Sequence, residues 1–269
     1  MISRSEDYVE YCRETARHLR NIEDLALRGK DKQQVTQRIQ ERILQAIDLR
    51  PDDEMVDIGC GDGTLLRMAR SRGVHGAIGL LATEEEVAIV SRLGLQVRQG
   101  FTDQLPLDDE SASVVVCNNV LLVVPKEKIA SSLREMYRVA RPGARIFVGE
   151  IPLEPGPSPE PEFATARQTF AYLYRQHGLR TALGMLRRMV YWKLTGQPMV
   201  IRGGSTISFY AQPPEFIAMA AAVGLRLARS WRHDDWPDNR YNYLFRKIAP
   251  PLSESTPHRD PVSETPPAA

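Results

Sequence analysis

Short β-branched runs alternate with amphipathic segments through the middle of the chain. Each run is short enough for a single strand, and the runs occupy residues 54–58, 76–81, 95–99, 113–117 and 144–150. The stretch 127–140 between the last two has apolar residues at helical spacing, and the RPG of 141–143 ends it. Strands separated by helical patterns indicate βαβ units, and therefore a parallel sheet covered by helices on both faces.

The two flanks of this region carry patterns of their own. Before it, residues 1–50 are polar and helical in pattern, with one apolar stripe formed by Val35, Ile39, Ile43, Leu44 and Ile47. After it, a helix at 213–223 precedes two strands at 225–231 and 240–247, which the DDWPDN turn at 234–239 joins. Strands joined by a short turn are antiparallel. The sequence thus predicts an α/β fold with a seven-stranded, mostly parallel doubly wound sheet, an antiparallel last strand, N-terminal helices and a helical lid insertion.

The same patterns divide the chain into segments. Residues 1–50 form an N-terminal helical segment, and residues 51–152 together with 205–248 form the sheet domain. A proline-rich joint at 152–161 opens the insertion at 153–204, which we expect to be a helical lid. Residues 249–269 contain six prolines and almost no large apolar side chains, so we expect a disordered tail.

The composition excludes several classes of protein. With 42% hydrophobic residues, 26% charged residues and a net charge of +1, the chain matches a soluble globular protein and no nucleic-acid partner is expected. The first residues are charged and lack the apolar core of a signal peptide, and no stretch approaches the ~20 apolar residues that span a bilayer. Cys12, Cys60 and Cys117 match no metal spacing, so we expect no metal site and reduced thiols in a cytoplasmic protein.

The strongest local motif is MVDIGCGDGTLL at residues 55–66. A predicted strand ends in Asp57, three glycines follow at 59, 61 and 63, and a helix begins near Thr64. Glycines permit positive φ and let a ligand approach the backbone, while the helix N-terminus offers unpaired N–H groups. The alternative is a tight strand-to-helix turn without a ligand. Because the motif follows a strand, opens a helix and begins a βαβ series, a ligand-binding turn is favoured.

The spacing of these glycines distinguishes the motif from the dinucleotide fingerprint G-x-G-x-x-G. Asp57-x-Gly59-x-Gly61-x-Gly63 resembles motif I of the class I S-adenosylmethionine-dependent methyltransferases, and the chain is similar to their type 11 domain. LPLDDESASVVVCNNVLLVVP at 105–125 resembles the family's fourth strand with its flanks. LREMYRVARPGARIFVGE at 133–150 resembles its next helix, turn and fifth strand, and 213–247 its closing antiparallel pair.

The resemblance implies S-adenosyl-L-methionine as cofactor, with its methionine portion against the glycine loop. The positions that correspond to cofactor contacts in the family are Asp57, Gly59, Cys60, Gly61, Gly63, Leu81, Phe101, Thr102 and Asn118. The family usually ends its second strand in an acidic residue that binds the ribose, where this chain has Leu81. Glu84 is one alternative for that role, and the other reading of Glu84, Glu85 and Glu86 is a favourable acidic helix N-terminus.

Two further positions depart from the family pattern. Phe101 stands where an acidic residue often contacts the adenine, and it either stacks on that ring or fills the site. Leu122 replaces a frequent histidine or glutamate. Because of these departures, one alternative is a protein that uses the fold as a scaffold or regulatory partner. An enzyme of another class, such as a cyclase or a decarboxylating enzyme, is the second alternative.

The activity implied by the resemblance is methyl transfer to a small acceptor. Glu150 at the end of the fifth strand, His177 in the insertion and His233 at the closing turn are the candidate catalytic groups, although a lone histidine is more often structural. Residues 163–202 contain seven Lys or Arg, no acidic residue and many aromatics. This charge predicts an anionic or sugar-containing acceptor, or peripheral membrane contact through 163–202. The alternative is an amphipathic lid with solvated arginines.

Overall fold

The computed structural model of the chain describes most of the predicted sheet domain and parts of its flanks. The described residues are 33–153, 209–232 and 240–248, with 9–10, 12–13, 16–17, 22–25, 174, 179, 183 and 186–187. Most of the predicted lid at 153–204 and all of the predicted tail at 249–269 lie outside these residues. No helix within the described part is long and apolar enough to cross a membrane.

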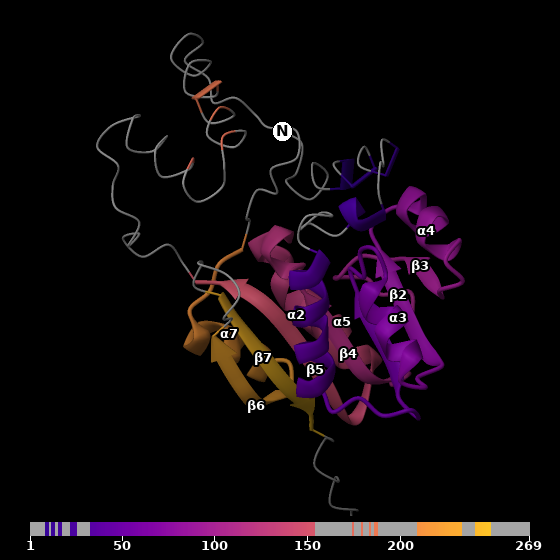
Figure 1. Cartoon of the computed structure of the whole chain (residues 1–269). Coiled ribbons are helices and arrows are strands. Elements are labelled where there is room, and N and C mark those ends of the chain that lie inside the picture. Colours follow the sequence, from indigo (N-terminus) through magenta and orange to yellow (C-terminus); the bar gives the residue numbers. More distant parts are fainter. Residues whose placement is uncertain are drawn as a thin grey trace, which may run out of the picture.

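One sheet forms the centre of the described part (Figure 1). Its strands are β1 (Glu54–Ile58), β2 (Gly76–Leu81), β3 (Val97–Gln99), β4 (Ala112–Asn118), β5 (Ala140–Pro152), β6 (Leu225–Arg232) and β7 (Arg240–Lys247). Their order is β3-β2-β1-β4-β5-β7-β6. The pairs from β3 to β5 are parallel, whereas β7 runs antiparallel to both β5 and β6. The predicted seven-stranded sheet with an antiparallel last strand is therefore confirmed.

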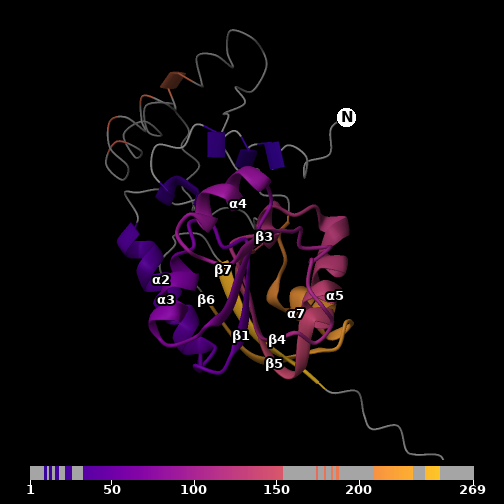
Figure 2. The same ribbon diagram turned by 90° about the vertical axis from the view of Figure 1, so that its right-hand side faces the viewer.

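Helices cover the sheet on both faces (Figure 2). Successive side chains of a strand point to opposite faces of the sheet, so apolar residues on both faces need a cover. One face packs against α2 (Gln33–Ala46), α3 (Thr64–Ser71) and α4 (Glu84–Ser91). The other packs against α5 (Ile129–Val139) and α7 (Pro213–Ala221). The short 3₁₀ helices are η1 (Ile22–Leu25), η3 (Leu121–Val123) and η4 (Lys126–Lys128).

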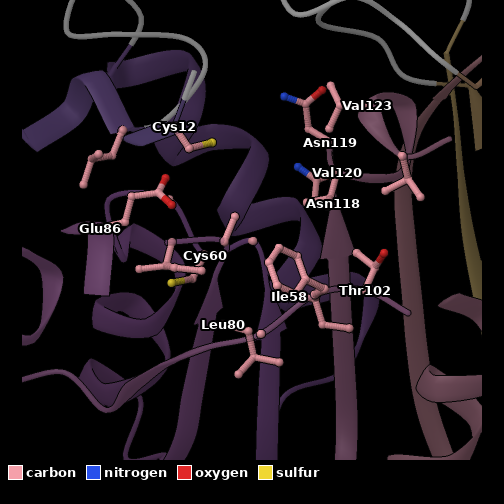
Figure 3. A pocket seen from close by; sticks show the side chains of 18 of the residues that line it. Cys12, Ile58, Cys60, Leu80, Glu86, Thr102, Asn118, Asn119, Val120 and Val123 are labelled. Carbon is pink, nitrogen blue, oxygen red and sulfur yellow. The ribbon is translucent and has the colours of Figure 1, made fainter. Parts of the chain in front are cut away.

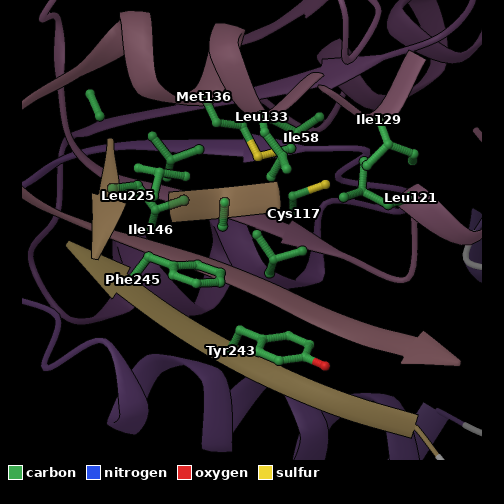
Figure 4. Close-up of a cluster of buried hydrophobic side chains, with 14 of the residues drawn as sticks. Ile58, Cys117, Leu121, Ile129, Leu133, Met136, Ile146, Leu225, Tyr243 and Phe245 are labelled. Carbon is green, nitrogen blue, oxygen red and sulfur yellow. The ribbon is translucent and has the colours of Figure 1, made fainter. Parts of the chain in front are cut away.

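The core on the α5 and α7 face extends from β2 to β6 (Figure 4). Ile129, Leu133 and Met136 recur at helical spacing along α5 and are fully buried. On the antiparallel side, the ring of Phe216 lies 4.8 Å from that of Tyr243. Aromatic pairs at this separation add to the burial of apolar surface. This contact fixes α7 against β7, which lies next to the edge strand β6.

Element bounds differ from the prediction at a few ends. The helix predicted at 127–140 begins at Ile129, because 126–128 form the 3₁₀ helix η4. The RPG of 141–143 lies inside β5, which begins at Ala140 and is longer than predicted. Gly143 has a φ of 80°, so the exposed start of this strand retains a turn-like residue. These differences leave the topology unchanged.

The end of α2 is fastened to the sheet by a buried arginine on β5. Arg145 pairs with the carboxylate of Asp53, and its guanidinium donates to the backbone carbonyls of Ile47, at 2.8 Å, and Asp48. Asp53 also accepts from the Ser113 hydroxyl at 2.7 Å. Since α2 contributes to the pocket described below, this clamp supports the site.

We expect Arg145→Ala to lower the free energy of unfolding by about 3 kcal/mol, because the buried Asp53 carboxylate loses its charged partner. Urea unfolding monitored by circular dichroism measures the effect. Arg50→Ala is the matched control, since Arg50 pairs with Asp48 at the surface and exposed ion pairs contribute little. Equal unfolding midpoints for Arg145→Ala and Arg50→Ala would contradict the proposed clamp.

Candidate cofactor-binding site

A pocket opens at the carboxyl ends of β1, β2 and β4 (Figure 3). The chain leaves β1 toward β2 on one side, whereas β4 lies on the other side of β1. The reversal of strand order beside β1 is a topological switch point, where open α/β sheets bind their ligands. Much of the pocket wall comes from the last residues of these strands and the loops at the same edge of the sheet, namely 58–62, 80–82, 100–103, 118–120 and 123–125.

The glycine loop adopts the left-handed backbone that its sequence predicts. The φ angles of Gly59, Gly61 and Gly63 are 74°, 53° and 71°. The amides of Gly59 and Cys60 both donate to the carbonyl of Leu80, at 2.9 and 3.2 Å. A Cβ on Gly59 would lie 2.4 Å from the Val120 side chain. The loop is therefore held against the β2 and β4 ends in a conformation that few other residues adopt.

Not every residue of the motif faces the pocket. Gly59, Cys60 and Gly61 line it, whereas Asp57 and Gly63 are absent from its lining. Gly63 is the N-cap of α3. Asp57 is buried in β1, and burial, with a smaller contribution from the charge of Asp62, raises the pKa of its carboxyl to about 7. Direct contact of Asp57 or Gly63 with a ligand in this pocket is not supported by these positions.

Two buried acceptor atoms in the pocket wall have no hydrogen-bond partner within the described part of the chain. They are Oε1 of Gln40, on α2, and Oδ1 of Asn118, at the end of β4. The Asn118 amide donates from Nδ2 to Oε1 of Glu150 at 3.0 Å. Because a carboxylate accepts and does not donate, this bond fixes which amide atom remains unpaired. A ligand that brings donors would satisfy both acceptors.

Glu150 lies behind the wall and is not among the residues that line the pocket. It is fully buried with a φ of 60°, and its Oε2 accepts from Arg240 at 3.3 Å. Arg240 also donates to Oδ1 of Asn119 at 3.0 Å. The pair thus orients the two asparagines at the end of β4, Asn118 and Asn119. The catalytic role of Glu150 stays a prediction, and its place in the fold is that of a support for Asn118. His177 and His233 lie outside the described residues.

The remaining predicted contacts, Leu81, Phe101 and Thr102, all line the pocket. Leu81 is buried, and the Phe101 ring is 43% exposed at the opening. The Thr102 hydroxyl lies 2.8 Å from that of Ser132, which ties the β3 loop to α5. Glu84 is exposed and absent from the lining, so the pocket wall does not support it as the ribose ligand.

Several lining residues were missed by the sequence reasoning. Thr36 and Gln40 of α2 line the pocket, as do Cys12 and Glu86. Thr36 and Gln40 lie one turn apart and share a face with the apolar stripe of α2, so polar residues on a buried face were the available signal. For Glu86 the signal was the sequence Thr83-x-x-Glu86, which is typical of a capping box. Cys12 carried no signal.

Comparison with known proteins agrees with this geometry. Residues 56–148 match a family model described as a methyltransferase domain. Malonyl-[acyl-carrier protein] O-methyltransferase of Serratia marcescens is 33% identical over 112 residues, which are 41% of this chain and 43% of that protein. The chain therefore spans less than half the length of this curated relative.

Solved structures share the fold at low sequence identity. A chain in the complex between the Haloferax volcanii Trm112 methyltransferase activator and a putative methyltransferase is 16% identical, with a TM-score of 0.58 over 89% of this chain and 98% of that one. The [4+2]-cyclase SpnF is also 16% identical, with a TM-score of 0.55 over 81% and 83%. These likenesses concern the fold alone. Motif I, the strand order and the family match together identify residues 56–148 as a methyltransferase domain of the class I S-adenosylmethionine-dependent family, whose cofactor is S-adenosyl-L-methionine.

Proposed function

We propose that this chain binds S-adenosyl-L-methionine in the pocket beside residues 59–62 and directs methyl transfer to a small, anionic or glycosyl-type acceptor. The observation that carries the proposal is the left-handed glycine loop at the switch point, beside buried acceptors that lack partners. If the turn bound no ligand, these buried acceptors would stay without partners, which costs free energy.

The pocket fits the chemistry of this cofactor. S-adenosyl-L-methionine brings an ammonium group, two ribose hydroxyls and an adenine amino group, all of which are hydrogen-bond donors. The wall offers the unpaired oxygens of Gln40 and Asn118 and the buried carboxylate of Glu86. Phe101 presents an exposed ring at the opening, where a flat base can stack. The backbone at Gly61 leaves room for the methionine portion, since this residue has no Cβ, whereas at Gly59 the Val120 side chain fills the space of a Cβ.

The residues of the chain act mainly by holding the reactants. The cofactor supplies a methyl group on a sulfonium, which is already an activated electrophile. Proximity and orientation then provide most of the acceleration that the protein must supply. Ile58, Val120 and Val123 form apolar parts of the wall and exclude water from the space beside the glycine loop. In this proposal Asn118, oriented by Glu150, contacts the reactants through its unpaired oxygen.

A general base is required only for an acceptor that is a poor nucleophile. Glu150 is engaged by Arg240 and Asn118 and is absent from the pocket lining, which favours a positioning role over proton abstraction. His177 and His233 remain the candidates for a base, on the sequence alone. We therefore favour an acceptor that ionises readily, such as a carboxylate or an acidic hydroxyl.

The charge of the insertion supports an anionic acceptor. Residues 163–202 hold seven cationic side chains and no acidic one, in a chain with a net charge of only +1. A concentration of one charge sign attracts ligands of the other sign, and salt weakens that attraction. The Serratia marcescens relative is named as an O-methyltransferase of a malonyl group on a carrier protein, which agrees with a carboxylate acceptor.

Calorimetry with S-adenosylhomocysteine tests the cofactor site, and a panel of charged and neutral acceptor pairs tests the acceptor. The panel contains sugar phosphates with the parent sugars, and hydroxybenzoates with hydroxybenzamides. We expect methyl transfer to the charged members, and a KM that rises with salt. Arg187→Gln with Arg188→Gln should raise that KM several-fold and weaken its salt dependence, with kcat and cofactor affinity unchanged.

Arg92→Gln with Arg226→Gln is the matched control, because it removes the same charge from exposed positions elsewhere. Equal effects of the two double variants would show that the insertion has no special role. Loss of cofactor affinity in the Arg187 and Arg188 variant alone would instead place the insertion at the cofactor site.

A non-methylating reaction in the same pocket is the second candidate. Leu122 stands where the family frequently has histidine or glutamate, and it is buried with its carbonyl bonded to the Phe209 amide at 3.2 Å. The [4+2]-cyclase that shares the fold at 16% identity supports this candidate, because one fold can host different chemistries. Tight S-adenosylhomocysteine binding without methyl transfer to any acceptor of the panel would favour this candidate.

A further inference from the structure

We propose that the carboxylate of Glu86 binds the vicinal ribose hydroxyls of the cofactor, in place of the residue that ends β2. This inference rests on the proposed function, since it takes the pocket to hold S-adenosyl-L-methionine. It assigns to α4 a recognition role that the family pattern places on the preceding strand.

The carboxylate of Glu86 lies close to the end of β2. Strand β2 ends at Leu81, which is apolar and buried, so the strand itself supplies no acceptor for a hydroxyl. Thr83 is the N-cap of α4, and Glu86 is the third residue of the helix. The two residues form a capping box in which Oε2 of Glu86 accepts from the Thr83 amide at 3.1 Å and from its hydroxyl at 2.9 Å. This box folds the carboxylate back toward the end of β2.

The side chain of Glu86 also forms part of the pocket wall. Glu86 is among the lining residues although only 5% of its surface is accessible. Figure 3 shows it below the thiol of Cys12, on the side of the pocket opposite the Asn118–Val120 segment. Burial raises the pKa of Glu86, while bonds from Thr83, Cys12 and Ala82 oppose that rise. The Cys12 thiol is a weak donor, so a hydroxyl that reaches the carboxylate would be a stronger partner.

The other carboxylates near the pocket lie elsewhere in its wall, are paired with a cation, or are absent from its lining. Asp62 lies between β1 and α3, away from the end of β2, and accepts from the Thr64 amide and hydroxyl at 3.0 and 2.8 Å. Asp103 pairs with Lys128 at 3.0 Å. Glu84 and Glu85 are absent from the lining. Glu86 is thus the carboxylate of the described pocket wall that combines burial with a position at the β2 end.

The experiment measures the affinity for S-adenosylhomocysteine and for its 2′,3′-dideoxy analogue by calorimetry. Glu86→Gln is the test variant, because glutamine preserves the capping box but removes the charge that strengthens bonds from hydroxyl donors. We expect its Kd for S-adenosylhomocysteine to rise 10-fold to 100-fold. The wild type should bind the analogue much more weakly than S-adenosylhomocysteine. The Glu86→Gln variant should bind the two ligands with nearly equal affinity. A merely structural role of Glu86 would not remove this discrimination between the two ligands.

Glu84→Gln is the matched control, since it removes one charge from the same helical turn at an exposed position. It should keep the wild-type affinities for both ligands. Equal discrimination in wild type and Glu86→Gln would overturn the inference. Equal affinities of the wild type for both ligands would also overturn the inference, and this test does not depend on the folding of Glu86→Gln. Failure of the wild type to bind S-adenosylhomocysteine at all would instead refute the proposed function.

Discussion

Gly61→Val is expected to reduce the affinity for S-adenosylhomocysteine at least 100-fold while the circular dichroism spectrum stays close to that of the wild type. Gly61 lines the pocket with a φ of 53°, a conformation that β-branched residues rarely adopt. A valine there would distort the loop and also fill space beside the backbone. Calorimetry measures the affinity.

The matched control for this variant is Gly143→Val. Gly143 also has a positive φ, at 80°, and a Cβ there would meet nothing within 4 Å. It lies at the exposed start of β5, remote from the pocket lining. The control therefore carries the backbone strain without the effect on the pocket. Wild-type affinity in Gly61→Val would remove the glycine loop from the cofactor site, whereas an equal loss in both variants would indicate a general effect of strain.

The sheet could be predicted from sequence because its signals are local. Each strand is a β-branched run with its own flanking turn, and helices such as α5 show their apolar face in the spacing of Ile129, Leu133 and Met136. The antiparallel closing pair followed from a short connection between two strands. The glycine loop was recognised for the same reason, since a strand, three glycines and a helix start lie within 55–66.

The rest of the site depends on contacts between distant parts of the chain. Glu150 was predicted as a catalytic group from its place at the end of β5, but its partner Arg240 is 90 residues away. Nothing local indicates that the two would pair behind the pocket wall. Gln40 lines the pocket because α2 packs against one face of the sheet. The apolar stripe on α2 predicts that this side of the helix is buried, but it does not predict that Gln40 reaches the pocket. Sequence thus indicated which strand ends carry the site, and not which side chains from other elements complete it.

Asp57→Asn is expected to stabilise the protein at pH 8 and to remove one component of its pH dependence. Burial raises the pKa of Asp57 from 3.8 to about 7, so the folded state favours the protonated carboxyl. At about 1.36 kcal/mol per pKa unit, the cost of ionising this group in the folded protein is on the order of 4 kcal/mol. Asparagine has nearly the shape of the protonated acid and carries no charge, so the variant avoids this cost.

The sign of the effect follows from proton linkage. Because the folded pKa lies above the unfolded one, the stability associated with Asp57 is fully present below about pH 4 and is lost as the pH rises through 7. Other carboxyls contribute in the opposite direction: Arg138 lowers the pKa of Glu135, and Arg72 lowers that of Glu41.

The informative quantity is therefore the difference in free energy of unfolding between Asp57→Asn and wild type, measured by urea unfolding from pH 4 to pH 8. This difference should grow with pH and level off above 7, while the exposed control Asp52→Asn should show no such growth. A constant difference would mean that Asp57 stays ionised throughout, which would require a cationic or donor partner that the buried end of β1 does not offer among the described residues.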